Sequence, residues 1–328
     1  MAHDVEIEIA AGEVTLSATL TIPDDPPEPA LPRGRGPAVV LLPSLLPRDR
    51  DGRLDRQRHR GWFAAASPGQ PGILARLADA LAARGVAALR YDKRGCGLSG
   101  GEWSSAGLFT LVDDARDALA VLRGLSAVDP GRIGLVGHGE GAWLALSVAA
   151  ADPAIGPLTL IGCPARGLRD VMRRGVAERA RRAHGLRAEP RHPFVMALDR
   201  ATEELIERSD RGESEMRLTL PGGRRTVIGL AGWEQAMRVA PRALATLQQR
   251  SVTVVHGAAD AWVDPDESAL LAAALWPSAA PRRILVPGAG HDLAEAPADL
   301  FHDLAADLAA RLQPRRLPTV LMSIGDAG

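Results

Sequence analysis

The chain has 328 residues, of which 46% are hydrophobic and 24% are charged, and its formal net charge at pH 7 is −1. This composition is ordinary for a globular enzyme, and the near-neutral charge gives no electrostatic basis for binding nucleic acid or an anionic membrane. Two cysteines, Cys96 and Cys163, are too few for a disulfide framework or a cysteine-bound metal cluster. Since no signal peptide or membrane-spanning apolar run is apparent, we expect a cytoplasmic location.

The predicted elements begin with two segments of alternating polar and apolar residues, 5–9 and 14–22, which indicate antiparallel strands. Helical periodicity covers 74–83, 108–125 and 142–150. The continuous apolar runs typical of buried parallel strands lie at 38–42, 86–91, 133–136, 158–161, 252–255 and 284–286. Repeated strand–helix units predict an α/β fold with a mostly parallel sheet of about eight strands and helices on both faces.

One segment interrupts this alternation. Residues 166–249 contain amphipathic helical stretches and no apolar run of the parallel-strand type. Because this segment leaves the sheet at the carboxyl end of the strand 158–161, where open α/β sheets place their sites, we interpret it as a helical cap. The alternative is a set of extra helices on one flank of the sheet. The core would then comprise residues 1–165 and 250–313, followed by a tail, 314–328.

The segment GHGEG at 137–141 carries the most information about function. It lies between the predicted strand 133–136 and the predicted helix 142–150, which is the setting of the G-x-S-x-G turn. In that turn the central residue is held in strained geometry at a helix N-terminus, where the helix dipole favours negative charge. The central residue of this chain is Gly139.

Together with four other segments, this turn resembles the α/β-hydrolase superfamily, and especially its bacterial esterase-like members. The other segments are LLPSLLPRDRDG, YDKRGCGLSGG, HGAADAWVDP and PGAGHDL, each at the carboxyl end of a predicted strand. The resemblance covers roughly residues 14–312 and implies the family fold with a serine–acid–histidine triad. It assigns Asp260 as the acid, preferred over its neighbours because it follows the strand directly, and His291 as the base.

The serine of that triad does not carry over, because Gly139 has no side chain with which to form an acyl-enzyme. The loop after the strand 38–42 also departs from the family, since its two prolines, Pro43 and Pro47, have no N–H to donate. The backbone amide of Glu140, with that of Ser44 or Leu45, remains as the candidate site for a developing oxyanion.

Other side chains of these loops are candidates to replace the missing serine. Cys163 follows the strand 158–161 and is a candidate pocket residue, although a small buried cysteine is the simpler interpretation. His138 is a candidate pocket residue at a variable position of the turn, with no special role assigned. Of the hydroxyl side chains, Ser44 comes nearest to fitting the role of nucleophile, but we expect its loop to lack the strained turn that exposes a nucleophile. No motif indicates a metal or another cofactor.

Three functions follow from these observations. We favour an enzyme that acts on a small molecule by acid–base catalysis through His291 and Asp260, without a serine acyl-enzyme; its reaction would be hydrolysis, elimination, isomerisation or cyclisation. The first alternative is a catalytically inactive pseudo-hydrolase that binds a ligand. The second is a serine carboxylesterase or thioesterase whose nucleophile was lost or mutated. The sequence indicates neither the substrate nor the oligomeric state.

Overall fold

The computed structural model describes residues 2–24, 35–55, 72–174, 193–219, 225–230, 233–277 and 281–313. An eight-stranded sheet runs through the described chain in the order β1-β2-β4-β3-β5-β6-β9-β10. Its strands are β1 (Ala2–Ala11), β2 (Val14–Pro23), β3 (Gly36–Leu42), β4 (Ala87–Tyr91), β5 (Val128–His138), β6 (Leu158–Ile161), β9 (Val252–Gly257) and β10 (Arg282–Val286). The predicted α/β fold with about eight strands is confirmed.

The sheet is mostly parallel. Strands β1 and β2 form an antiparallel hairpin, and β2 pairs antiparallel with β4. All pairs from β4 to β10 are parallel, so their carboxyl ends meet at one edge. The alternating pattern at the N-terminus belongs to the hairpin, whose β1 strand is largely exposed, and the continuous apolar runs belong to the covered strands.

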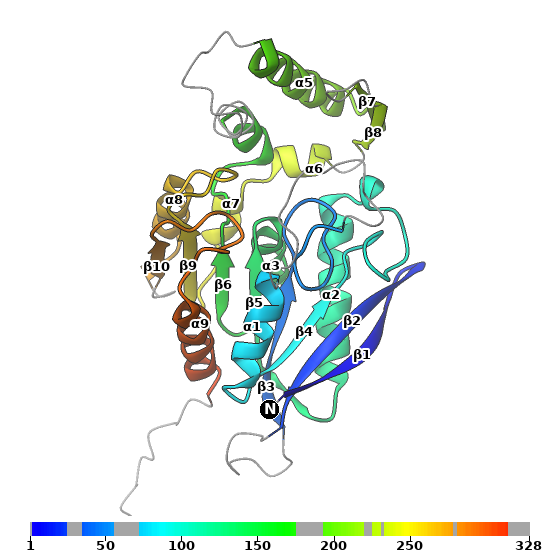
Figure 1. Cartoon of the computed structure of the whole chain (residues 1–328). Coiled ribbons are helices and arrows are strands. Elements are labelled where there is room, and N and C mark those ends of the chain that lie inside the picture. The colour runs from blue at the N-terminus through cyan, green and yellow to red at the C-terminus, as the bar shows by residue number, and fades with distance from the viewer. Residues whose placement is uncertain are drawn as a thin grey trace, which may run out of the picture.

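Helices cover both faces of the sheet (Figure 1). Alternate residues of β3 enter two separate hydrophobic clusters: Val39 and Leu41 pack in one, and Val40 and Leu42 in the other. Helices α1 and α9 contribute to the first cluster, and α2, α3 and α8 to the second. The bounds of these helices are α1 (Ile73–Ala82), α2 (Leu108–Gly124), α3 (Glu140–Ala151), α8 (Asp266–Ala274) and α9 (Ala298–Arg311).

The chain between β6 and β9 holds several further elements. They are a helical stretch at 168–174, α5 (Pro193–Asp210), β7 (Glu215–Thr219), β8 (Arg225–Gly229), α6 (Trp233–Arg238) and α7 (Pro241–Ala245). Figure 1 shows α5 and the β7–β8 hairpin at the end of the molecule, with α6 between them and the sheet. The segment is therefore not purely helical. The limits of a cap domain at 166–249 stay a prediction.

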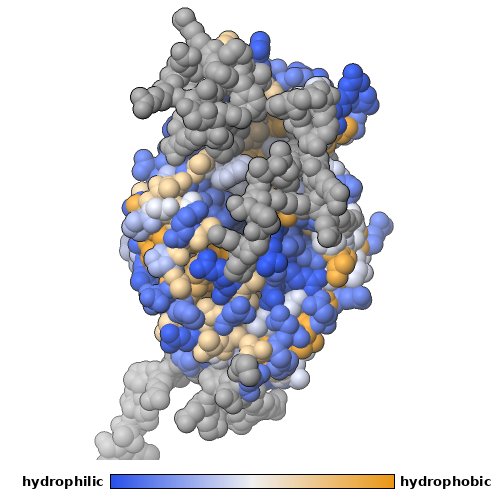
Figure 2. Space-filling view, in the orientation of Figure 1, coloured by the Kyte–Doolittle hydropathy of each residue, from blue (hydrophilic) through white to orange (hydrophobic). Residues whose placement is uncertain are grey.

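Two further features concern the surface. A short 3-10 helix, η1 (Trp103–Ser105), lies beside β8, where the backbone at Gly229 closely approaches Ser104. Figure 2 shows hydrophilic side chains over much of the face turned to the viewer, interspersed with smaller hydrophobic areas. In the described part of the chain, every helix is too short or too polar to cross a bilayer.

Candidate active site

The register of the sheet brings three loops together. Strand β3 pairs with β4 and β5 so that Leu41 lies opposite both Arg90 and Val136. Three residues further along each chain stand Ser44, Lys93 and Gly139. Parallel strands leave the sheet at the same edge, so this register places the three residues side by side at the start of their loops.

The turn between β5 and α3 is sharp. Gly139 has φ 55° and ψ −114°, a conformation that residues with a Cβ rarely adopt, and its amide donates to the Ile161 carbonyl at 2.7 Å. A Cβ at Gly141 would overlap the carbonyl group of Leu42. The turn and the first residues of α3 can therefore approach the end of β3 closely only because glycine stands at these positions.

The loops after β9 and β10 bring Asp260 and His291 together. The Nδ1 atom of His291 lies 2.8 Å from Oδ2 of Asp260, and the aspartate side chain is fully buried. The other carboxylate oxygen, Oδ1, accepts from the amides of Trp262 at 2.7 Å and Val263 at 3.0 Å. His256 Nε2 lies 3.1 Å from Oδ2. Each carboxylate oxygen thus has a partner, which fixes the orientation of the imidazole.

These contacts also set the charge of Asp260. Burial acts to raise the pKa of this carboxyl, but the positive charge that His291 can carry and the hydrogen bonds accepted from both histidines and from Val263 outweigh burial. The pKa of Asp260 therefore lies well below its usual value. A permanently ionised Asp260 can stabilise an imidazolium at His291 without taking its proton.

On its other side, the imidazole meets Ser44. Nε2 of His291 lies 3.3 Å from Oγ of Ser44. A Cβ added at Gly139 would overlap this Oγ and lie 3.0 Å from the same Nε2. The Ser44 hydroxyl therefore occupies the place where a side chain at position 139 would begin.

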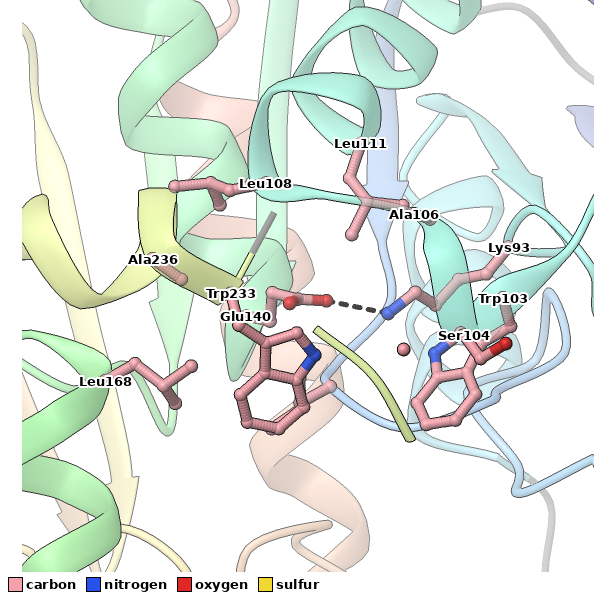
Figure 3. Close-up of a pocket in the computed structure, with 12 residues that line it drawn as sticks. Lys93, Trp103, Ser104, Ala106, Leu108, Leu111, Glu140, Leu168, Trp233 and Ala236 are labelled. Carbon is pink, nitrogen blue, oxygen red and sulfur yellow. Dashed lines mark hydrogen bonds and ion pairs between the residues drawn. The ribbon is translucent and has the colours of Figure 1, made fainter. Parts of the chain in front are cut away.

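The Ser44 loop is held by a buried lysine. Lys93 Nζ donates to the Ser44 carbonyl at 3.1 Å and to Glu140 Oε2 at 2.6 Å. Figure 3 shows this ion pair beside a small pocket, with the indoles of Trp103 and Trp233 nearby. Because the Lys93 side chain is only 2% exposed, the pair joins the β3 loop to the start of α3 in a medium where charge pairing is strong.

Arg48 links the same loop to the histidine loop. Its guanidinium donates to the carbonyls of Leu45 at 3.2 Å and Gly52 at 2.5 Å, and it pairs with Asp292 at 3.1 Å. Asp292 directly follows His291. Burial acts to raise the pKa of Asp292, but the charge and hydrogen bond of Arg48, together with the two nearby histidines, outweigh burial and lower this pKa. Arg48 thus fixes the distance between the loops that carry Ser44 and His291.

The ring of His138 lies next to that of His291. Its ring centroid is 4.7 Å from that of His291, and its Nε2 lies 3.1 Å from the His291 carbonyl oxygen. Burial, followed by the nearby His291, lowers the pKa of His138 to about 3, so the ring is neutral. Ligating atoms of His138, His291 and Asp292 lie within 4.8 Å of one another. Since those atoms already form the contacts described here, we assign the trio to holding the loop in place.

An apolar cavity of about 200 Å³ opens onto His291, Ser44 and Gly139. The apolar part of its lining is Leu45, Leu46, Trp143, Pro164, Leu168, Val171, Met172, Trp233, Ala236, Trp262 and Val263. Arg48 and Glu140 also reach it.

Of the residues predicted at the site, Asp260 contacts Nδ1 of His291 and is not part of the cavity lining. His138 and Cys163, the two candidate pocket residues, are fully buried and do not belong to this lining.

Cys163 lies apart from the imidazole contacts. Its thiol donates to the Pro164 carbonyl, and burial, together with the charge of Glu267, raises its pKa. A thiol held neutral in this way is a poor nucleophile. The simpler interpretation of Cys163, a small buried side chain at a strand end, agrees with its surroundings.

Comparison with known proteins identifies the family. A family model described as "Serine aminopeptidase, S33" matches residues 70–297. The chain belongs to this family of α/β-hydrolases. The matched region includes the β5–α3 turn, Asp260 and His291, whereas Ser44 lies outside it.

Two kinds of curated relative share part of this α/β-hydrolase. One is an acyltransferase, DrtE, of Aspergillus calidoustus, 35% identical over 123 residues, which are 35% of this chain and 38% of the relative. Another is an uncharacterized protein of Mycobacterium tuberculosis, 35% identical over 132 residues, or 46% of its length. The chain therefore matches less than half of either relative.

Solved structures support the fold over nearly the whole α/β-hydrolase chain. Est1E from Butyrivibrio proteoclasticus with bound ferulic acid has a TM-score of 0.61 and 18% identity, covering 93% of this chain and 99% of the other. DcsB, in complex with a substrate analogue, has a TM-score of 0.63 and 16% identity, covering 95% and 100% of the chains. At such identities the likeness concerns the fold alone.

Proposed function

We propose that this chain is an enzyme that cleaves an ester or thioester bond of a small substrate, with His291 as general base and acid and Asp260 orienting it. The observation that carries the proposal is the dyad at the wall of an apolar cavity, with Nδ1 of His291 bound to Asp260 and Nε2 beside Ser44. No covalent intermediate forms at Gly139, which has no side chain. The paired dyad and the family membership support this function.

In this proposal the imidazole first accepts a proton and then donates it. Nε2 of His291 first takes a proton from the attacking hydroxyl, and the ionised Asp260 stabilises the resulting imidazolium. The imidazolium then gives the proton to the departing alcohol or thiol. The low pKa of Asp260 supports this assignment, because the carboxylate stays charged and leaves the proton on the ring.

Negative charge on the carbonyl oxygen would be stabilised at the start of α3. Glu140 is the first residue of that helix, so its amide has no acceptor within the helix and lies at the positive end of the dipole. The amide of Leu45, across the cavity, is the second candidate donor. Pro43 and Pro47 cannot contribute, so the hole would be made by Leu45 and Glu140.

The cavity lining supports a substrate with a hydrophobic acyl or aryl group. Its leucine, valine, methionine and tryptophan side chains offer apolar contact. Arg48 and Glu140 are charged residues of the same lining. The names of the relatives agree with acyl chemistry, since one is an acyltransferase and another structure is an esterase domain from Rhodothermus marinus. The acceptor of the acyl group would be water or a second small molecule.

The test is turnover of a panel of aryl esters and thioesters by the full chain and by His291→Ala. His302→Ala is the control, because His302 is an exposed residue of α9. Turnover that His291→Ala abolishes and His302→Ala preserves would support the proposal. Turnover that survives in His291→Ala would refute it. Elimination, isomerisation or cyclisation by the same dyad would appear as His291-dependent consumption of a substrate without hydrolysis.

A ligand-binding protein without turnover is the second candidate. The glycine at position 139 favours it, because the turn that normally exposes the nucleophile carries no reactive group. This function predicts that a hydrophobic ester binds in the cavity and is recovered unchanged. Isothermal titration would measure the binding, and analysis of the ester after incubation separates the two functions, because only the enzyme converts it.

A further inference from the structure

We propose that Ser44 is the nucleophile of this enzyme, supplied by the loop after β3 in place of the side chain that Gly139 lacks. This inference rests on the proposed function, because it uses the same His291 and Asp260. It differs in adding a covalent acyl-enzyme, which the sequence had not indicated.

The geometry is that of a triad with one member moved. Asp260 Oδ2, His291 Nδ1 and Nε2, and Ser44 Oγ form a continuous chain with distances of 2.8 and 3.3 Å. The second distance is long, as is common before a substrate tightens the site. A Cβ at position 139 would overlap this Oγ atom, so a serine at 139 requires the Ser44 hydroxyl to turn away from its observed place.

The loop of Ser44 has its own strained residue. Leu46 adopts φ 76°, a left-handed conformation that is rare for a branched, bulky side chain. The strain lies two residues after Ser44 and not at the serine itself, so this loop differs from the turn in which the strained residue is the central one. Strain of this kind persists only where the surroundings impose it, and here Lys93 holds the Ser44 carbonyl while Arg48 holds that of Leu45. Both contacts aim the hydroxyl at the imidazole.

The reaction would proceed in two balanced steps. Ser44 Oγ attacks the acyl carbon while its proton passes to His291 Nε2, and the tetrahedral oxyanion collapses to an acyl-serine ester as the imidazolium protonates the leaving alcohol or thiol. A water or an acceptor hydroxyl then attacks the acyl carbon and gives its proton to His291. When Ser44 Oγ leaves, it recovers that proton.

Other hydroxyl and thiol groups fit this role less well. Within the described part of the chain, Ser44 is the hydroxyl that contacts His291 Nε2. Cys163 is buried against Pro164 and is absent from the cavity lining. Ser44, in contrast, borders the cavity together with His291 and Gly139.

Covalent labelling tests the inference directly. A fluorophosphonate would react with the full chain as Ser44 Oγ displaces fluoride and its proton passes to His291. Intact mass spectrometry should show one label per chain, and peptide mapping should place it on Ser44. Ser44→Ala and His291→Ala should both lose labelling. A label on any other residue, or no label on a chain that shows His291-dependent turnover, would overturn the inference.

Exchange of the two positions gives a second, independent test. Ser44→Gly should lower kcat by about 10³-fold or more, as removal of a triad member does. The double variant Ser44→Gly/Gly139→Ser frees the space for a serine at 139, and it should regain labelling, now at position 139, with at least about 10-fold higher kcat than Ser44→Gly. A double variant that regains neither would contradict the shared position of the two side chains.

The outcomes separate this inference from the proposed function. If Ser44→Ala keeps turnover while His291→Ala loses it, the enzyme works without an acyl-serine, and only the inference fails. If Ser44 merely donates a hydrogen bond to the oxyanion, Ser44→Ala slows turnover but the wild-type chain shows no burst of released alcohol and no label. If Ser44 is labelled but no ester or thioester is turned over, the inference stands and the proposed reaction fails.

Discussion

The loops after β9 and β10 and the loops after β3 and β5 approach the same cavity but are built in different ways. In the first pair, Asp260 and His291 contact each other through side chains that are fixed by neighbouring amides and a second histidine. In the second pair, the residue at the turn is glycine, and the hydroxyl that contacts His291 belongs to Ser44, in the loop after the adjacent strand β3. The acid–histidine pair is thus set within its own loops, whereas the hydroxyl depends on how two strands are paired.

The largest effect is expected on the acid–histidine side. Asp260→Asn should lower kcat by about 10⁴-fold, because an amide cannot stabilise the imidazolium and favours the wrong tautomer. Asp264→Asn is a matched control, since Asp264 is an exposed acid in the same loop. Steady-state kinetics on the best ester of the panel measure both variants. Equal losses in the two would show that the loop, and not the dyad, matters.

The next largest effect is expected at the support of Ser44. Lys93→Met leaves Glu140 without its partner in a mostly buried position, so we expect the free energy of unfolding to fall by about 3–5 kcal/mol. Lys93→Met/Glu140→Leu should recover most of this loss in urea unfolding. Its kcat should remain low, because the Ser44 carbonyl has still lost its donor. A double variant with full activity would show that Lys93 has no positioning role.

A smaller effect is expected at the turn itself. Gly139→Ala should cost about 1–3 kcal/mol of stability through its positive φ, and should lower kcat about 10- to 100-fold by pushing Ser44 away from His291. Gly12→Ala shares the positive φ but has nothing within 4 Å of the added Cβ. Thermal unfolding should detect both variants, and kinetics only the first. Full activity in Gly139→Ala would mean that the Ser44 hydroxyl is not needed at its observed place.

The smallest effect concerns Asp49, in the loop that continues from Ser44. Burial, with the nearby charges of Asp51 and Asp92, raises the pKa of Asp49 to about 6 from 3.8. The folded chain therefore holds this proton to a higher pH than the unfolded chain does. The free energy of unfolding consequently falls as the pH rises from 3.8 to about 6. Asp49→Asn, which keeps the acceptor oxygen, should be about 1 kcal/mol more stabilising at pH 8 than at pH 4. Chemical unfolding at both values checks this, and a pH-independent difference would contradict it.

The sequence predicted the sheet well because its signals are local. The apolar runs at 38–42 and 158–161 lie within or match β3 and β6, since covered parallel strands need side chains that are apolar on both faces. Strand β5 begins at Val128, earlier than predicted. Its first residues were missed because they form a polar stretch that contains a proline. The β7–β8 hairpin was missed, although two alternating segments flank the turn signal PGG at 221–223.

The residues of the site also differ in whether a local sequence signal marks them. Asp260 and His291 could be proposed from sequence because each follows an apolar strand in a recognisable loop. The contact of Ser44 with His291 joins residues 247 positions apart and has no motif of its own. The available signal was the order and register of β3 and β5, which would have placed Ser44 next to Gly139. A local pattern does not contain that pairing.

The overlap between Ser44 Oγ and a side chain at position 139 also limits how such a protein can change over generations. A lineage that starts from a serine at 139 and ends with this arrangement must alter two sites. One order of mutation passes through a protein in which two hydroxyls compete for one space, and the other through a protein with neither. With Ser44 as the proposed nucleophile, each single change therefore has a cost, because a serine at 139 displaces the Ser44 hydroxyl and the loss of Ser44 leaves the imidazole without a hydroxyl.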